Sequence, residues 1–176
     1  MNRQLDKYIA ILPFVFAAHN IEEAISFGIV QEFSFYVVKQ AQFIIAVSLF
    51  SILGFMVVFC KKLYQNDSQY RYFITGFAGM LFLNAFFPHI IATLYFKAYM
   101  PGVITAILLI LPLTGYILRE TYRLSLFSKQ QFITTIITGG MIGAVLVVFF
   151  LGIGWGVLWL SQKHLTLSNL EEIRFL

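Results

Sequence analysis

Charged residues are scarce in this chain. They make up 11% of its 176 residues, whereas apolar residues make up 60% and aromatic residues 18%. An ordinary soluble domain has roughly a quarter charged residues and about half apolar ones. A chain this short cannot hide so much apolar surface in one core, and its mean hydropathy is +0.84. We therefore exclude a water-soluble domain and expect an integral membrane protein.

Cysteine and clusters of basic residues are also nearly absent. The single cysteine, Cys60, excludes an internal disulfide and a cysteine-based metal site, and we expect it to be a packing residue. The formal net charge of +4 comes from basic residues scattered near the ends of apolar runs, without a dense lysine and arginine tract. The sequence therefore predicts no nucleic-acid partner.

Long apolar runs are abundant instead. Five of them are long enough to cross a hydrocarbon layer of ~30 Å at ~1.5 Å per helical residue. They cover residues 8–30, 40–60, 72–96, 101–118 and 132–160, and a polar tail follows at 161–176. We therefore expect an all-α protein, in which residues 1–176 form a single domain built as a bundle of about five transmembrane helices.

The distribution of lysine and arginine predicts the orientation of this bundle. If all five runs cross the membrane, eight of the twelve basic residues fall on the side of the N-terminus. Cytoplasmic loops collect basic residues, so we expect the N-terminus inside and the C-terminus outside. Counted from the inner helix ends, His19 lies ~18 Å and Asn84 ~20 Å along their helices. Polar residues of the first and third runs are thus expected at a matching depth in the outer half of the bilayer.

The first run contains two acidic residues that composition does not explain. An ionised carboxylate at the centre of a membrane helix costs roughly 2.5–3.5 kcal/mol even on lenient scales, and here Glu22 and Glu23 are adjacent. Residues three and four apart share a helix face, so His19 can reach both carboxylates. Such a set suits Zn²⁺, Fe²⁺ or Mn²⁺. By analogy with H-x-x-E-H sites, we assign His19 and Glu23 as metal ligands and Glu22 as general base.

The third run supplies candidates for the rest of such a site. His89 lies at a matching depth and is the predicted third metal ligand. Asn84 is about 140° away from it in a regular helix, but Pro88 removes a backbone donor, and a kink or wide turn there would bring both side chains inward. Tyr99 begins a Y-x-P-G turn at the same face of the membrane. We expect Asn84 and Tyr99 to orient a substrate.

A His-x-x-Glu-Glu signature in the first helix, here HNIEE at residues 19–23, followed by an Asn/His element and a Y-x-P-G turn, resembles the HXXEE-domain family of small bacterial membrane proteins. The motifs extend from residue 19 to residue 102, and the later helices add none. The resemblance implies no activity, because the function of that family is unknown. Intramembrane glutamate proteases carry E-E-x-x-x-R instead, and no arginine follows Glu23 at that spacing.

Three hypotheses for function follow. The first is a metal-dependent hydrolase acting on a lipid or lipid-linked substrate, with zinc as the preferred metal and iron or manganese as alternatives. The second is a proton- or cation-coupled carrier or small-ligand binding protein, and the third is a polar network that only fixes helix packing. The fifth run also contains Gly139, Gly143, Gly152 and Gly156. This small-xxx-small spacing suits a close helix contact or a homodimer in the bacterial cytoplasmic membrane.

Overall fold

The computed structural model describes residues 3–27, 38–124 and 126–174, with residues 164–174 described by their backbone. Within these ranges the chain is all-helical, and five helices are long and apolar enough to cross a membrane. They run over Arg3–Phe27, Gln40–Phe59, Asp67–Phe96, Val103–Arg123 and Lys129–Lys163. The predicted all-α fold with five spanning helices is therefore confirmed, and by the length and composition of its helices the chain is a membrane protein.

The helices differ from the predicted segments mainly at their ends. α1 (Arg3–Phe27) begins before residue 8, and residues 28–30 of the first predicted segment lie outside the described residues. α2 (Gln40–Phe59) stays close to the segment 40–60. α7 (Lys129–Arg174) continues without a break into the polar tail predicted after residue 160. The tail contains neither proline nor glycine to end a helix there.

The third and fourth spanning helices each contain a wide turn. The third consists of α3 (Asp67–Asn84), the π-helical turn η3 (Ala85–Ile90) and α4 (Ile91–Phe96). The fourth consists of α5 (Val103–Thr105), the π-helical turn η4 (Ala106–Ile110) and α6 (Leu111–Arg123). Both interruptions lie toward the same end of the bundle, and the candidate site is built there.

Local signals set several of these boundaries. A short 3₁₀ turn, η2 (Lys61–Leu63), links α2 to α3. The side chain of Asn66 then caps α3 by accepting a hydrogen bond from the backbone N–H of Gln69 at 2.9 Å. At the C-terminal end of the third spanning helix, α4 ends before Lys97, which adopts the left-handed conformation with φ 51°.

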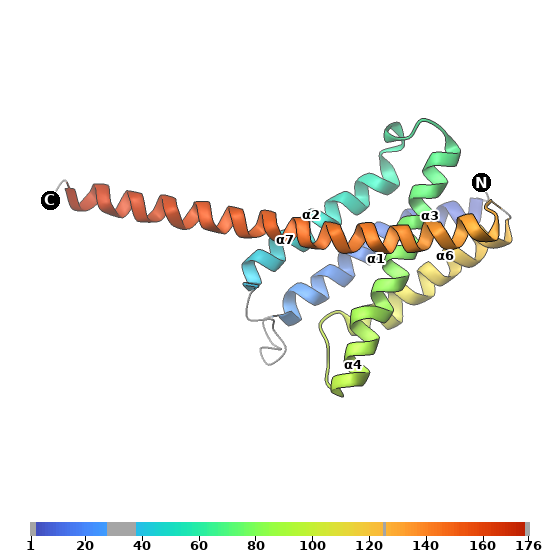
Figure 1. Cartoon of the computed structure of the whole chain (residues 1–176), viewed down its shortest axis with the longest axis horizontal. Helices are drawn as coiled ribbons and strands as arrows, with labels where there is room; N and C mark the ends of the chain where they lie inside the picture. The colour runs from blue at the N-terminus through green and yellow to red at the C-terminus, as the bar shows by residue number, and fades with distance from the viewer. Residues whose placement is uncertain (1–2, 28–37, 125, 175–176) are drawn as a thin grey trace.

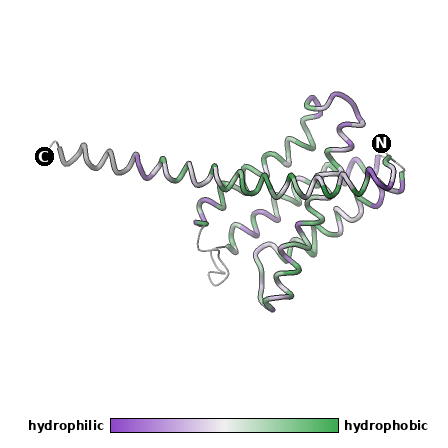
Figure 2. The backbone as a smooth tube through the Cα atoms, viewed as in Figure 1, coloured by the Kyte–Doolittle hydropathy of each residue, from purple (hydrophilic) through white to green (hydrophobic). Residues whose placement is uncertain are grey.

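The helices pack as one bundle that α7 crosses obliquely. α7 lies along α3 and α2, while α1 lies against α2 and α6 (Figure 1). The N-terminus, the α2–α3 link and the α6–α7 link gather at one end of the bundle, and the C-terminal part of α7 extends beyond the other helices. In Figure 2, hydrophobic residues predominate along the helices, and hydrophilic ones concentrate at helix ends and links. This is the hydropathy pattern of helices solvated by lipid.

A continuous apolar core joins the first four spanning helices. Its buried members include Leu12, Phe16, Ile74, Leu81, Ile110 and Ile117. Many large apolar side chains point outward instead, for example Phe14, Phe73, Leu108 and Val148. In a soluble protein such an apolar surface would mark a binding site, whereas here a hydrocarbon solvent accounts for it.

Glycine permits the contact between α3 and α7. A Cβ atom at Gly139 would clash with the backbone of Gly76, and one at Gly143 would clash with the side chain of Met80. The first small-xxx-small pair of α7 therefore serves a close contact within the chain. Gly152 and Gly156 differ, because a Cβ atom at either would meet no described atom within 4 Å.

Candidate metal centre

The polar residues predicted from the sequence gather near the C-terminal end of α1. His19, Glu22 and Glu23 come from α1, His89 comes from η3, and Tyr99 lies in the link between α4 and α5. The two histidines are 1% and 3% exposed, and the side chain of Glu23 is 15% exposed. Two imidazoles thus lie buried, with a partly exposed carboxylate beside them.

The π-helical turn η3 determines where His89 points. In a regular helix Asn84 and His89 would face about 140° apart, yet Asn84 Nδ2 lies 3.1 Å from His89 Nε2. Pro88 has no backbone N–H to donate, and Phe87 leaves the helical conformation with φ −128° and ψ 116°. The turn widens as a result, and both polar side chains face the same side. Turns of this kind are frequent at functional sites.

The hydrogen bonds of His19 assign its ring proton. His19 Nδ1 lies 2.8 Å from Thr105 Oγ1, and the Thr105 hydroxyl donates to Glu22 Oε2 at 2.5 Å. A hydroxyl has one hydrogen, so Thr105 accepts from His19, and Nδ1 carries the proton. Nε2 of the neutral ring then presents a lone pair. It is buried and has no hydrogen-bond partner among the described residues.

The second histidine is arranged in the same way. His89 Nδ1 lies 2.7 Å from the carbonyl oxygen of Pro101. A carbonyl oxygen only accepts, so Nδ1 of His89 carries the proton and Nε2 presents a lone pair, toward which the Asn84 amide donates at 3.1 Å. Metal-binding histidines are commonly held like this, with one ring nitrogen donating to a carbonyl or a carboxylate network and the other facing the ion.

Three acceptor atoms consequently face one another. Glu23 Oε1 lies 3.7 Å from His19 Nε2 and 3.2 Å from His89 Nε2, and the two imidazole rings meet edge to face with centroids 4.7 Å apart. Lone pairs at such distances repel unless a proton or a cation lies between them. Ligand atoms of all three residues lie within 4.8 Å of one another, and zinc bonds of ~2.0–2.1 Å separate neighbouring ligands by ~3.4 Å. The set fits one divalent ion.

Gly102 covers this set of side chains. Its φ of 84° lies in the left-handed region that favours glycine. A Cβ atom at this position would lie 2.7 Å from Glu23 Cγ, 2.8 Å from His19 Cε1 and 2.9 Å from His89 Cε1. Both the backbone conformation and the available space therefore require glycine in the Y-x-P-G turn.

Glu22 faces a different set of groups. Its Oε1 accepts from the Tyr99 hydroxyl at 2.6 Å and from the Ile104 N–H at 3.2 Å. Its Oε2 accepts from the N–H of Thr105 at 2.7 Å, in addition to the hydroxyl of that residue. The two backbone donors belong to the first turn of the fourth spanning helix, where unpaired N–H groups and the helix dipole favour a carboxylate. Glu22 thus ties α1 to the start of that helix.

Tyr99 is held as a donor in this network. Burial, together with the bond that its hydroxyl donates to Glu22, raises the pKa of Tyr99 above its ordinary value. The phenol therefore stays protonated at neutral pH. Tyr99 is 38% exposed, so it connects the Glu22 network to the surface.

The structure brings together all six residues that the sequence singled out, and it adds two. The additions are Thr105, which links Glu22 to His19, and Gly102, which covers the three acceptor atoms. A signal for Thr105 was present, since it is the first hydroxyl residue after the Y-x-P-G turn, at the start of an apolar run. Nothing in the spacing alone indicates that this hydroxyl contacts a histidine 86 residues earlier in the chain.

Comparisons with known proteins agree with the signature in α1. A family model described as a protein of unknown function with HXXEE motif matches residues 10–117. The chain belongs to this family. The part that matches the HXXEE family includes every residue of the candidate metal centre. The chain is also similar to the uncharacterized protein YrkK of Bacillus subtilis (strain 168), with 30% identity over 148 residues, 81% of this chain and 93% of the relative. No solved structure matches the chain.

Proposed function

We propose that this chain is a membrane-embedded, metal-dependent enzyme whose divalent ion is held by His19, Glu23 and His89. One observation carries the proposal: two unprotonated imidazole nitrogens and a carboxylate oxygen converge, while Nδ1 of each ring is engaged as a donor. A metal ion would replace the Asn84 amide as the partner of His89 Nε2. Two nitrogens and one oxygen match three-ligand catalytic zinc sites, which keep a further position for water or substrate. Zinc is the first choice of metal, and iron and manganese accept the same set.

Hydrolysis of a lipid or lipid-linked substrate is the reaction that we propose. A zinc ion with a free coordination position polarises a carbonyl or phosphoryl oxygen and activates water. Glu23 is partly exposed, and the neighbouring side chains of Phe86 and Phe87 in η3 are exposed. An acyl chain would therefore find an apolar surface beside the centre, which supports a substrate from the membrane.

The contacts of Glu22 bear on its role in this reaction. Both of its oxygens accept hydrogen bonds from the α4–α5 link and the fourth helix, which supports a positioning role acting on His19 through Thr105. The base role assigned from the sequence requires Glu22 to release these donors and stays a prediction. Asn84, bonded to His89, and Tyr99, exposed beside Glu22, stay predicted substrate-orienting residues.

The surroundings that we propose follow from the sequence. The excess of basic residues at the end that holds the N-terminus supports an N-terminus inside and a C-terminus outside, with the centre in the outer half of the bilayer. Similarity to a Bacillus subtilis protein supports a bacterial cytoplasmic membrane. Gly152 and Gly156 on α7 have no described neighbour within 4 Å of an added Cβ atom, and this free small-residue surface supports a homodimer through that helix.

A carrier is the second candidate, and the contact between His89 and Glu23 favours it. At 3.2 Å, a proton shared between the two side chains would remove the repulsion as well as a metal ion does. The residues of the centre would then bind and release protons or a cation during transport. Enzyme and carrier differ in one measurable property, which is the resident metal.

Metal analysis of the purified protein tests the metal site. We expect about one zinc, iron or manganese ion per chain in the wild type and at least a tenfold lower content in His19→Ala and Glu23→Ala. Asn20→Ala is the matched control, because Asn20 is another buried polar residue of α1 and bonds to Val47 and Ser51 of α2. A metal-free wild type, or equal losses in Asn20→Ala and His19→Ala, would contradict the proposal.

An activity assay separates the enzyme from the carrier. The purified protein in vesicles is offered a fluorogenic phosphatidylcholine, and proton uptake is followed in the same vesicles under a pH gradient. Hydrolysis that is lost on chelation, restored by zinc and absent in Glu23→Ala supports the enzyme. Proton uptake that depends on Glu23, without resident metal or hydrolysis, would favour the carrier.

A further inference from the structure

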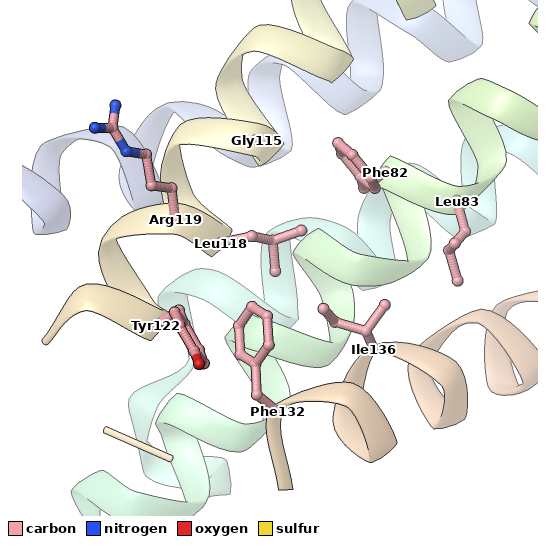
Figure 3. Close-up of a pocket in the computed structure, with 8 residues that line it drawn as sticks. All are labelled: Phe82, Leu83, Gly115, Leu118, Arg119, Tyr122, Phe132 and Ile136. Atoms are coloured by element: carbon pink, nitrogen blue, oxygen red, sulfur yellow. The ribbon is translucent and has the colours of Figure 1, made fainter. Parts of the chain in front are cut away.

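An open groove lies between α3, α6 and α7, and it is lined by other residues than those of the candidate metal centre. Its volume is about 350 Å³, and Figure 3 shows its lining. The walls consist of Phe82 and Leu83 from α3, Leu118 from α6, and Phe132 and Ile136 from α7. We call this the α3–α6–α7 groove. None of its lining residues takes part in the network around His19 and Glu22, so it needs an explanation of its own.

One end of the groove carries polar groups. Arg119 and Tyr122 of α6 border it there, and in Figure 3 the guanidinium of Arg119 extends away from the apolar lining. Arg119 has no carboxylate partner among the described residues, whereas Arg123, one turn later, lies 3.5 Å from Glu120. An unpaired guanidinium at the rim suits a phosphate, which it can bind with two parallel hydrogen bonds.

The direction of the groove matches that of a lipid molecule. Arg119 lies one turn before the end of α6, at the membrane boundary of that helix. Phe82 and Leu83 lie ~22–24 Å along α3 from its first residue, well inside the apolar part. The groove thus runs from a cationic rim into an apolar interior. Basic pockets between transmembrane helices are recognised sites for anionic lipid headgroups.

We propose that the α3–α6–α7 groove is a binding site for one anionic phospholipid, with its phosphate at Arg119 and an acyl chain along Phe82, Leu118 and Ile136. Charge complementarity at the rim selects the anionic headgroup, and the apolar walls hold the chain. Gly115 borders the free space of the groove, because an added Cβ atom there would meet only Phe82 Cε2, at an ordinary contact distance of 3.8 Å. A larger side chain at residue 115 would project into the space of the acyl chain. The site is independent of the proposed enzyme.

Native mass spectrometry tests the headgroup contact. The purified full chain is equilibrated with phosphatidylglycerol and phosphatidylcholine that have identical acyl chains. We expect the wild type to retain one phosphatidylglycerol preferentially and Arg119→Gln to lower this preference about fivefold. Lys62→Gln is the control, because Lys62 is an exposed basic residue in η2, outside the groove. Equal binding of the two lipids by the wild type, or equal losses in both variants, would overturn the proposal.

Filling the groove tests the chain contact. Gly115→Leu should lower retention of both lipids at least tenfold, whereas Gly115→Ala should retain the preference of the wild type. Both substitutions favour the helix over glycine, and circular dichroism confirms that each variant is folded. Retention by Gly115→Leu equal to that of Gly115→Ala would show that the lipid does not lie in the groove. The Arg119→Gln result stands without this variant if Gly115→Leu does not fold.

Discussion

Two adjacent carboxylates of α1 have opposite surroundings. Glu22 meets only donors, two from backbone N–H groups and two from the hydroxyls of Tyr99 and Thr105. Glu23 meets two imidazole nitrogens that carry no proton. Successive side chains on a helix point about 100° apart. Glu22 therefore faces the N-terminus of the fourth spanning helix, whereas Glu23 faces the imidazole rings of His19 and His89.

This difference supports the proposal that the two glutamates of one motif have separate structural and chemical roles. A carboxylate that is fully hydrogen-bonded in the membrane stabilises the fold without any ligand. A carboxylate that faces other acceptors destabilises it unless a cation is bound. If Glu23 holds the proposed metal ion, the doubled glutamate of HNIEE joins a structural residue to a ligand-binding one, and substitutions at the two positions should have opposite consequences.

The largest expected effect is on stability at Glu22. In protein treated with a chelator, Glu22→Ala should lower the free energy of unfolding by about 3 kcal/mol, because four donors lose their acceptor. Glu23→Ala should lower the free energy of unfolding by no more than about 1 kcal/mol, or should raise it, because a repulsive contact disappears. Unfolding in detergent followed by circular dichroism measures both. Similar losses at the two positions would remove the contrast between the carboxylates.

The next effect concerns the link between the two regions. Thr105→Val keeps the shape of the side chain but removes the donor to Glu22 and the acceptor for His19 Nδ1. Zinc affinity should fall about 10–100-fold, the usual result of losing a residue that orients a metal ligand. Thr105→Ser, which keeps the hydroxyl, should stay within about threefold of the wild type, as titration with a zinc indicator can show. If the Thr105→Val protein binds zinc as tightly as the Thr105→Ser protein, the hydroxyl does not position His19.

The smallest effect is expected at the surface of the Glu22 region. Tyr99→Phe removes one of the four hydrogen-bond donors to Glu22. Because Tyr99 is 38% exposed, water can replace part of the lost hydrogen bond. The free energy of unfolding should fall by about 0.5–1 kcal/mol, and zinc affinity should not change. A loss of zinc binding in this variant would mean that Tyr99 belongs to the Glu23 region.

The sequence predicted the fold more completely than it predicted the contacts within the site. Long apolar runs with few charges give the spanning helices directly, because a bilayer admits little else. Glu22, Glu23 and His19 stood out because intramembrane charge is costly, and Pro88 indicated the wide turn that brings Asn84 to His89. These are local or compositional signals, and no tertiary contact is needed to recognise them.

What could not be predicted depends on contacts between distant segments. The different surroundings of Glu22 and Glu23 come from Thr105 and Gly102, which reach α1 only after the fourth helix packs against it. The ring protons of His19 and His89 are assigned by partners 86 and 12 residues away. Gly139 and Gly152 look alike in sequence, yet within the described part of the chain only Gly139 lies against another helix.

X-ray absorption spectroscopy at the metal edge tests the central claim most directly. On protein purified with its metal, or loaded with one equivalent of zinc, we predict two imidazole nitrogens and a carboxylate oxygen at ~2.0–2.1 Å. The imidazole contribution should fall by one ligand in His89→Ala and stay unchanged in Glu22→Gln. A metal shell without imidazole, or one that loses an oxygen ligand in Glu22→Gln and none in Glu23→Gln, would contradict the account.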